Sequence, residues 1–167
     1  MPVPAHLQPL HDRLLSLGGD RVVLFLDGYE EVIRDCGIAV PGGVPAIKGG
    51  LDSSCHQTSA ILQLLAPGRR HIVTGYALSE DGCWRRHSWA MQDGKVMEPT
   101  VERLQYFGVT LEDEVDILRF IAPEVPVEVY VTVAEKVAAG HLGGKVFKKA
   151  DLVRVQRLID AGHRGQP

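Results

Sequence analysis

Three strand-like segments in the middle of this chain limit its possible folds more than any other part of the sequence. Residues 71–78, 83–91 and 96–100 are rich in strand-forming residues, and two short polar turns separate them. The second turn carries Asp93-Gly94, a pair suited to a type I′ hairpin, which needs positive φ at both of its central residues. The sequence therefore predicts a three-stranded antiparallel meander.

The Asp-Gly turn also predicts the register of the last two strands. If the turn has two residues, Gln92 faces Lys95, and pairing continues outward until Trp89 faces Glu98. Paired residues share a face and side chains alternate along a strand, so His87, Trp89 and Glu98 are expected on the same side of the sheet. His87 and Glu98 are then diagonal neighbours, about 7–8 Å apart at the backbone, which a hydrogen bond between their side chains can span.

Segments on both sides of the meander show periodicities of their own. Before the meander, the patterns predict a helix over 6–17, a short buried strand over 21–26, a helix over 29–35 and a loop over 37–51. After it, they predict a helix over 110–121 capped by Thr110, a strand over 127–133 and a helix over 149–161. This order of elements favours an α+β domain over alternating βαβ units.

Composition limits the compartment and the partners. With 167 residues, 45% of them hydrophobic, the chain is expected to form a single domain over 1–167. A net charge of -3 gives no general attraction to nucleic acid or to anionic lipid, and neither a secretory signal nor an apolar run of roughly 18 residues is found. The cysteines number three, so at least one is free unless it pairs between chains. We therefore expect a cytoplasmic protein without a membrane or nucleic-acid partner.

Cys55 lies at a predicted helix start. Ser54 and Gln57 form a capping-box pattern, and apolar residues at helical spacing follow. This places Cys55 in the first turn, where free N–H groups and the helix dipole favour a negative charge. The sequence therefore predicts a thiol whose pKa is lowered.

Cys55, His87 and Glu98 together have the composition of a catalytic triad. A carboxylate bonded to one imidazole nitrogen fixes the tautomer and leaves the other nitrogen to take a proton from a thiol. Each residue also has a structural interpretation: Cys55 as a small buried side chain, His87 as an exposed strand residue and Glu98 as a solvated strand end. The agreement of three separate features favours the triad, provided that the start of the Cys55 helix packs against the strand that carries His87.

A zinc site is the second constellation that the residue types allow. Cys55, His56, His71, Cys83 and His87 are all possible ligands. Cys83 and His87, however, are four residues apart in a strand, about 13 Å at the usual rise, which is too far for joint ligation. His56 is expected to point elsewhere on its helix, so the sequence predicts neither a metal nor another cofactor.

Short motifs around these residues are similar to those of a known family. They are Ser-Cys-His-Gln at a helix start, Gly-Tyr-Ala-Leu, His87-Ser88-Trp89, Asp-Gly-Lys-Val, Glu98-Pro99-Thr100 and Tyr-Phe-Gly-Val, within residues 50–110. This region resembles the core of papain-like thiol enzymes of the transglutaminase-like type, and among them small bacterial proteins with a His-Ala-Trp strand and an Asp-Pro-Thr ending.

The resemblance implies a papain-like/transglutaminase-like core, in which a nucleophile helix packs on an antiparallel meander with flanking helices. It implies a cysteine hydrolase or acyltransferase that forms a thioester on a peptide, amide or acyl substrate. Cys55 would be the nucleophile, His87 the general base and later the acid, and Glu98 the orienting residue.

The chain departs from the family pattern at several positions. Glu98 stands where Asp is usual, Ser88 stands where Ala is usual, and no glutamine lies shortly upstream of Cys55 to supply an oxyanion donor. The Cys55 backbone N–H and the Gln57 side chain are the candidates that are left for that role. Trp89 and Tyr76 are candidates for the acyl pocket, and both could equally be core aromatics.

A different class of function stays open. The chain could be a binding or regulatory module on a thiol-enzyme scaffold, with the basic segment Lys145 to Arg157 as a contact surface. Its alternation of basic and apolar residues is more typical of a solvated amphipathic helix. An ionised thiol at Cys55 would favour the enzyme.

Overall fold

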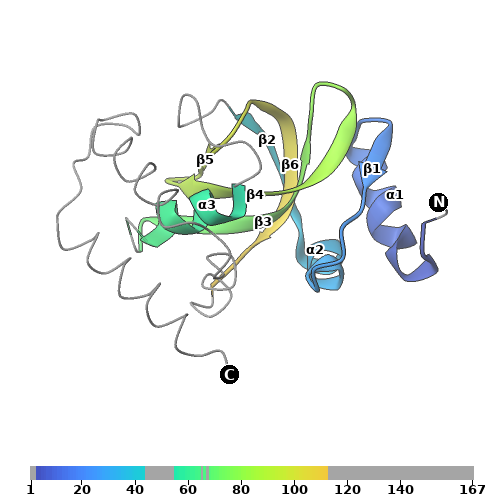
Figure 1. The fold of residues 1–167 in the computed structure, drawn as a ribbon, viewed down its shortest axis with the longest axis horizontal. Helices are drawn as coiled ribbons and strands as arrows, with labels where there is room; N and C mark the ends of the chain where they lie inside the picture. The colour runs from blue at the N-terminus through green and yellow to red at the C-terminus, as the bar shows by residue number, and fades with distance from the viewer. Residues whose placement is uncertain (1–2, 44–54, 65, 67, 113–167) are drawn as a thin grey trace.

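The structure is a computed structural model that describes residues 3–43, 55–64, 66 and 68–112. It is a mixed α+β structure with one six-stranded sheet and few helices (Figure 1). The elements, in chain order, are η1 (Ala5–Leu7), α1 (Gln8–Leu17), β1 (Arg21–Val23), α2 (Glu30–Cys36), β2 (Ile38–Gly43), α3 (Cys55–Leu64), β3 (Arg70–Leu78), β4 (Cys83–Gln92), β5 (Lys95–Met97) and β6 (Arg103–Thr110).

The predicted meander is confirmed as β3, β4 and β5. The sheet has the order β1-β4-β3-β6-β2, with β5 paired to β4, and all neighbours are antiparallel except β1 and β4. Gln92 pairs with Lys95 and Ala90 with Met97, as the Asp-Gly turn predicted. Both central residues of that turn have positive φ, 53° at Asp93 and 74° at Gly94.

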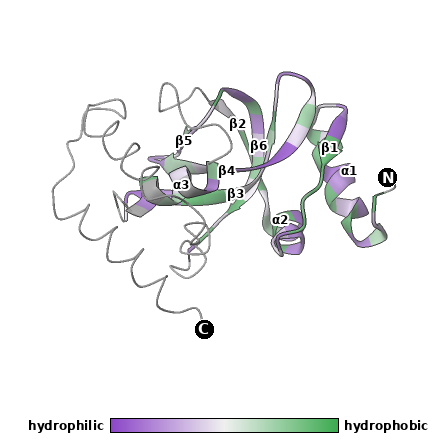
Figure 2. Ribbon diagram, in the orientation of Figure 1, coloured by the Kyte–Doolittle hydropathy of each residue, from purple (hydrophilic) through white to green (hydrophobic). Residues whose placement is uncertain are grey.

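One face of the sheet is covered by helices. The predicted helix over 6–17 is confirmed as η1 and α1, and its Leu10 and Leu14 are buried with Ile33 of α2. These side chains pack on Tyr76, Trp84 and other apolar residues of the sheet. Figure 2 shows β3 mostly in hydrophobic colours, in line with its almost complete burial. α3 packs against β4 and β3, at the other end of the sheet from α1 (Figure 1).

The opposite face of the sheet carries a second apolar cluster, formed by Val73, Ala77, Trp89 and Tyr106. His87 alternates onto this same face of β4. β2 and β5 come from opposite edges of the sheet, yet they contact each other. The sheet therefore curls around this face, which buries the second cluster.

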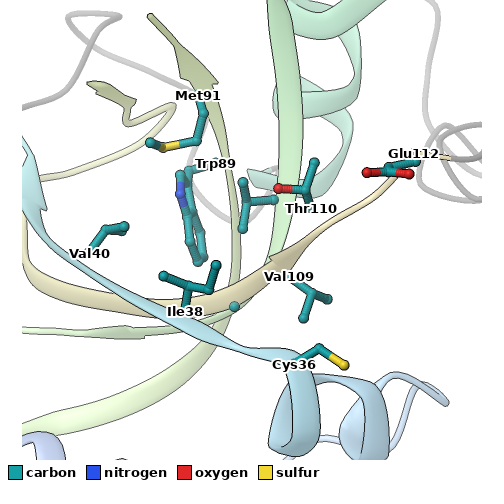
Figure 3. A pocket seen from close by; sticks show the side chains of 10 residues that line it. Cys36, Ile38, Val40, Trp89, Met91, Val109, Thr110 and Glu112 are labelled. Carbon is teal, nitrogen blue, oxygen red and sulfur yellow. The ribbon is translucent and has the colours of Figure 1, made fainter. Parts of the chain in front are cut away.

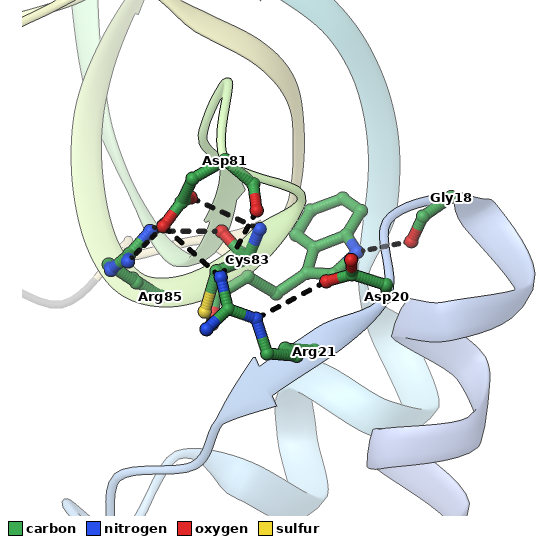
Figure 4. Close-up of polar contacts among 7 residues, drawn as sticks. Gly18, Asp20, Arg21, Asp81, Cys83 and Arg85 are labelled. Carbon is green, nitrogen blue, oxygen red and sulfur yellow. Dashed lines mark hydrogen bonds and ion pairs between the residues drawn. The ribbon is translucent and has the colours of Figure 1, made fainter.

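β1 is joined to the turn between β3 and β4 (Figure 4). The Trp84 indole N–H donates to the Gly18 carbonyl at 2.7 Å. Arg21 donates to the Asp81 carbonyl at 3.2 Å, and Arg85 donates to both carboxylate oxygens of Asp81 at 2.8 and 2.6 Å. These contacts fix the short strand β1 beside β4 although it pairs over only three residues.

Two predictions about the elements before β3 are wrong. The predicted loop over 37–51 begins with the strand β2, whose Pro41 is tolerated because β2 is an edge strand. The predicted buried strand over 21–26 ends at Val23 and is largely exposed, because β1 is also an edge strand, and Phe25 and Leu26 beyond it are exposed.

Other expectations end at the limits of the described residues. Thr110 ends β6 instead of beginning a helix, and β6 itself was not predicted. Several other predictions lie outside the described residues. They are Ser54, the rest of the loop over 37–51, the remainder of the helix over 110–121, the strand over 127–133, the helix over 149–161 and the basic segment. None of the described helices is long and apolar enough to cross a membrane.

Candidate active site

The candidate site forms at the edge of β4 that faces away from β3. β1 pairs with this edge at residues 83–85 and β5 pairs with it at residues 90–92. Within the described ranges, no strand pairs with the stretch between them. The start of α3 lies at this gap, because His56, the second residue of α3, has its Nδ1 atom 2.6 Å from the Ser88 hydroxyl. Cys55 is the first residue of α3, as predicted.

His87 and Glu98 form a buried pair, as the predicted register requires. The Nε2 atom of His87 lies 3.0 and 2.9 Å from the two carboxylate oxygens of Glu98. Glu98 is 0% exposed and His87 is 3% exposed. Because Nε2 is bonded to the carboxylate, the other ring nitrogen, Nδ1, is left for the hydrogen bond between His87 and the Cys55 thiol.

Glu98 accepts hydrogen bonds from other residues besides its pairing with His87. The Tyr106 hydroxyl donates to Oε2 at 2.7 Å, and the backbone N–H and hydroxyl of Thr100 both donate to Oε1 at 2.8 Å. Burial raises the pKa of Glu98, but these bonds and the charge of His87 outweigh it and hold that pKa below its usual value. The carboxylate is therefore fixed in place and ionised beside the imidazole.

Aromatic rings cover the imidazole. The rings of Trp89 and Tyr106 each lie 6.3 Å from that of His87, at angles of 18° and 26°, and 4.7 Å from each other. Gly108 makes room for them, since a Cβ at this position would lie 2.7 Å from the Trp89 ring. The stack keeps water from the ion pair, which strengthens the attraction between its charges.

The electrostatics of the pair favour a thiolate. Burial raises the pKa of the Cys55 thiol, but the hydrogen bond and charge of His87 and the Ser88 N–H outweigh it, so that the pKa is lowered. Burial lowers the pKa of His87, whereas the bonds to Cys55 and Glu98 raise it to about 9. Opposite shifts in two bonded groups are the pattern of a thiolate–imidazolium pair.

His56 points to the helix-covered face of the sheet, not to the face that carries His87, in line with the prediction that it points elsewhere than Cys55. Its Nδ1 lies 2.6 Å from the Ser88 hydroxyl, on the helix-covered face of the sheet. His56 is therefore placed beside the candidate triad without belonging to it. Within the described ranges, no group of three or more His, Cys, Asp or Glu side chains is arranged to hold a metal ion.

The three further candidates from the sequence lie in different places. Trp89 belongs to the ring stack on His87. Tyr76 lies on the opposite, helix-covered face, where it is fully buried in the apolar core and its hydroxyl accepts from the Phe25 N–H at 3.4 Å. Tyr76 is thus not brought to the triad, because strand alternation turns it to the other side. The side chain of Gln57 lies outside the described part of the structure.

Trp89 also forms one wall of a recess of about 360 Å³ (Figure 3). Ile38, Val40, Val109 and Met91 supply much of its apolar lining, from strands β2, β6 and β4. The indole of Trp89 therefore separates this recess from the imidazole of His87. Both interpretations of Trp89 from the sequence, core aromatic and pocket wall, are compatible with this position.

Sequence reasoning missed Tyr106 and Thr100 as partners of Glu98. Thr100 follows Glu98 by two residues, so its backbone and hydroxyl could have been recognised as local donors to that carboxylate. Tyr106 reaches Glu98 from β6, and the pairing of β6 with β3 carries no local signal. The motif that contains Tyr106 was recognised only as part of the resemblance.

No family model, no curated protein and no solved structure matches this chain. The resemblance to papain-like enzymes therefore stays a prediction.

Proposed function

We propose that this chain is a cysteine-dependent enzyme that hydrolyses or transfers an acyl group through a thioester on Cys55. The observation that carries the proposal is the buried His87–Glu98 pair, whose imidazole lowers the pKa of the Cys55 thiol through a hydrogen bond and its charge. A cysteine at a helix start, packed on an antiparallel sheet that bears the histidine and the acid, also agrees with a papain-like or transglutaminase-like core.

The proposed reaction has two halves. In the first, the Cys55 thiolate attacks the carbonyl carbon of an amide or ester, and the tetrahedral intermediate then expels the amine or alcohol. The His87 imidazolium gives its proton to that leaving group, which leaves a thioester on Cys55 and a neutral imidazole. Glu98 keeps Nε2 engaged throughout and so holds Nδ1 toward the reacting atoms.

The second half regenerates the enzyme. Water, or an acceptor amine, attacks the thioester and gives its proton to His87, and the C–S bond breaks to release the acid or the new amide. Cys55 leaves as the thiolate, beside the imidazolium. The Cys55 backbone N–H, at the free end of α3, is a candidate donor to the oxyanion in both halves.

The test is acylation of the intact chain by p-nitrophenyl acetate, with each cysteine followed by mass spectrometry. We expect an acetyl group on Cys55 at short times, followed by its loss to water, and no such turnover in Cys55→Ala. Cys36, which is exposed, is the internal control for ordinary thiol chemistry. Acetylation of Cys55 no faster than that of Cys36 would contradict the proposal and favour a binding module on an enzyme-like scaffold.

A further inference from the structure

A second polar chain lies beside the candidate triad and takes no part in the proposed reaction. It runs from His56, the residue after Cys55, to β4 and on to β3. His56 Nδ1 lies 2.6 Å from the Ser88 hydroxyl, and the Ser88 hydroxyl lies 2.9 Å from that of Thr74. Ser88 and Thr74 are 0% exposed and face each other across the two strands.

Ser88 acts on two successive residues of α3. Its backbone N–H is one of the groups that lower the pKa of the Cys55 thiol. Its side chain is hydrogen-bonded to His56 on the helix-covered face. One residue of β4 therefore restrains the first turn of the helix from two directions, and the next residue along the strand is His87.

The polar chain is suited to an uncharged His56. Burial and the positive charges of Arg86 and His87 lower the pKa of His56 to about 3. Two carboxylates of the described residues are paired with other groups, Asp27 with Arg86 and Glu98 with His87. A neutral imidazole can accept at Nδ1, so the hydroxyl of Thr74 can donate to Ser88 and that of Ser88 to His56.

We infer that His56 and Ser88 are positioning residues, which fix the first turn of α3 on β4 so that the Cys55 sulfur meets both His87 and the Ser88 N–H. The inference rests on the proposed function only in taking Cys55 as the nucleophile. It also accounts for a departure from the family pattern, because alanine at position 88 could not bond to His56. A displacement of the sulfur by a fraction of an ångström weakens both of its bonds.

The test is the pH dependence of Cys55 alkylation by iodoacetamide in the intact chain. Ser88→Ala keeps the backbone N–H and removes the hydroxyl. We expect it to raise the apparent pKa of the Cys55 thiol and to slow alkylation near neutral pH by about tenfold. Ser59→Ala is the matched control, because Ser59 is also buried but its hydroxyl has no partner within the described residues. This control should leave the profile unchanged.

A pair of variants at His56 separates positioning from general stability. His56→Gln keeps a side chain that can accept from Ser88, and we expect it to retain most of the parent profile. His56→Leu cannot accept, and we expect it to behave like Ser88→Ala. This pair decides the question even if Ser88→Ala does not fold.

The experiment has two negative outcomes, which contradict different proposals. A parent profile with an ordinary thiol pKa would contradict the proposed function itself. A lowered thiol pKa in the parent that is unchanged in Ser88→Ala and His56→Leu, with only thermal stability affected, would overturn the positioning role and leave the proposed function standing.

Discussion

Glu98 is a carboxylate without exposed surface, and its donors come from three parts of the chain: His87 of β4, Tyr106 of β6 and Thr100 just beyond β5. Burying a charge is costly unless it is paired and hydrogen-bonded, and Glu98 is both. Glu98 therefore contributes both to the stability of the fold and to the chemistry of the site, because the same hydrogen bonds hold the edge of the sheet and orient the imidazole.

Glu98→Gln should be strongly destabilising near pH 6, because it leaves the His87 charge buried without its partner. We expect a loss of about 3 kcal/mol in the free energy of unfolding, measured by urea denaturation. Tyr106→Phe removes one donor to the same carboxylate and should cost about 1.5–2 kcal/mol, less than the loss of the charge. Equal losses in the two variants would mean that the charge of Glu98 is not what matters.

At the scale of the elements, the turn between β4 and β5 delivers Glu98 to His87. Because this turn is local, its Asp-Gly chemistry allowed the register and the His87–Glu98 contact to be predicted from the sequence. β2 and β6 were missed, since their pairing is long-range and Pro41-Gly42-Gly43 has the composition of a loop. The place of β6 beside β3 is what brings Tyr106 to the site, so that contact could not be predicted either.

Gly108 of β6 is the position where the strand most directly controls the ring stack. A Cβ there would lie 2.5 Å from the Thr74 carbonyl oxygen and 2.7 Å from the Trp89 ring, so Gly108→Ala must move a strand or the indole. We expect a loss of about 2–3 kcal/mol in the free energy of unfolding, and slower alkylation of Cys55 as His87 shifts.

Leu104→Ala is the control for this prediction. Leu104 is in the same strand, but its side chain is 53% exposed, so its truncation should change the free energy of unfolding by about 0.5 kcal/mol or less. If Gly108→Ala is as mild as this control, the close packing of Trp89 on β6 does not exist in solution.

For the whole molecule, the site couples stability to pH. The pKa of Glu98 is lowered in the folded chain, so Glu98 adds stability above its unfolded pKa, about 4.5, which is lost as the pH falls through its folded pKa. The raised pKa of His87 stabilises the folded chain below about pH 6.5, and this stabilisation is lost as the pH rises toward 9. The lowered pKa of Cys55 has the opposite effect, so its contribution to stability grows with pH over that range.

Below pH 6, the ionisation of Glu98 predicts how the free energy of unfolding changes with pH. The difference in the free energy of unfolding between the parent and Glu98→Gln should be largest near pH 6 and should shrink as the pH falls below about 4.5, because a protonated Glu98 resembles glutamine. Parallel urea titrations from pH 6 to the lowest pH at which both chains fold measure it. A difference that does not change with pH would show that Glu98 is not ionised in the folded chain.

We expect His87 to hold the Cys55 thiol as a thiolate, and iodoacetamide labelling of Cys55 across a pH series measures this ionisation. Mass spectrometry follows Cys55 in the parent and in His87→Ala, with exposed Cys36 as an internal reference. We predict a labelling pKa for Cys55 well below the value of about 8.5 of a free thiol, and a rise toward that value in His87→Ala. A Cys55 that labels like Cys36 in the parent, or a low labelling pKa that survives the loss of His87, would contradict a thiolate held by His87.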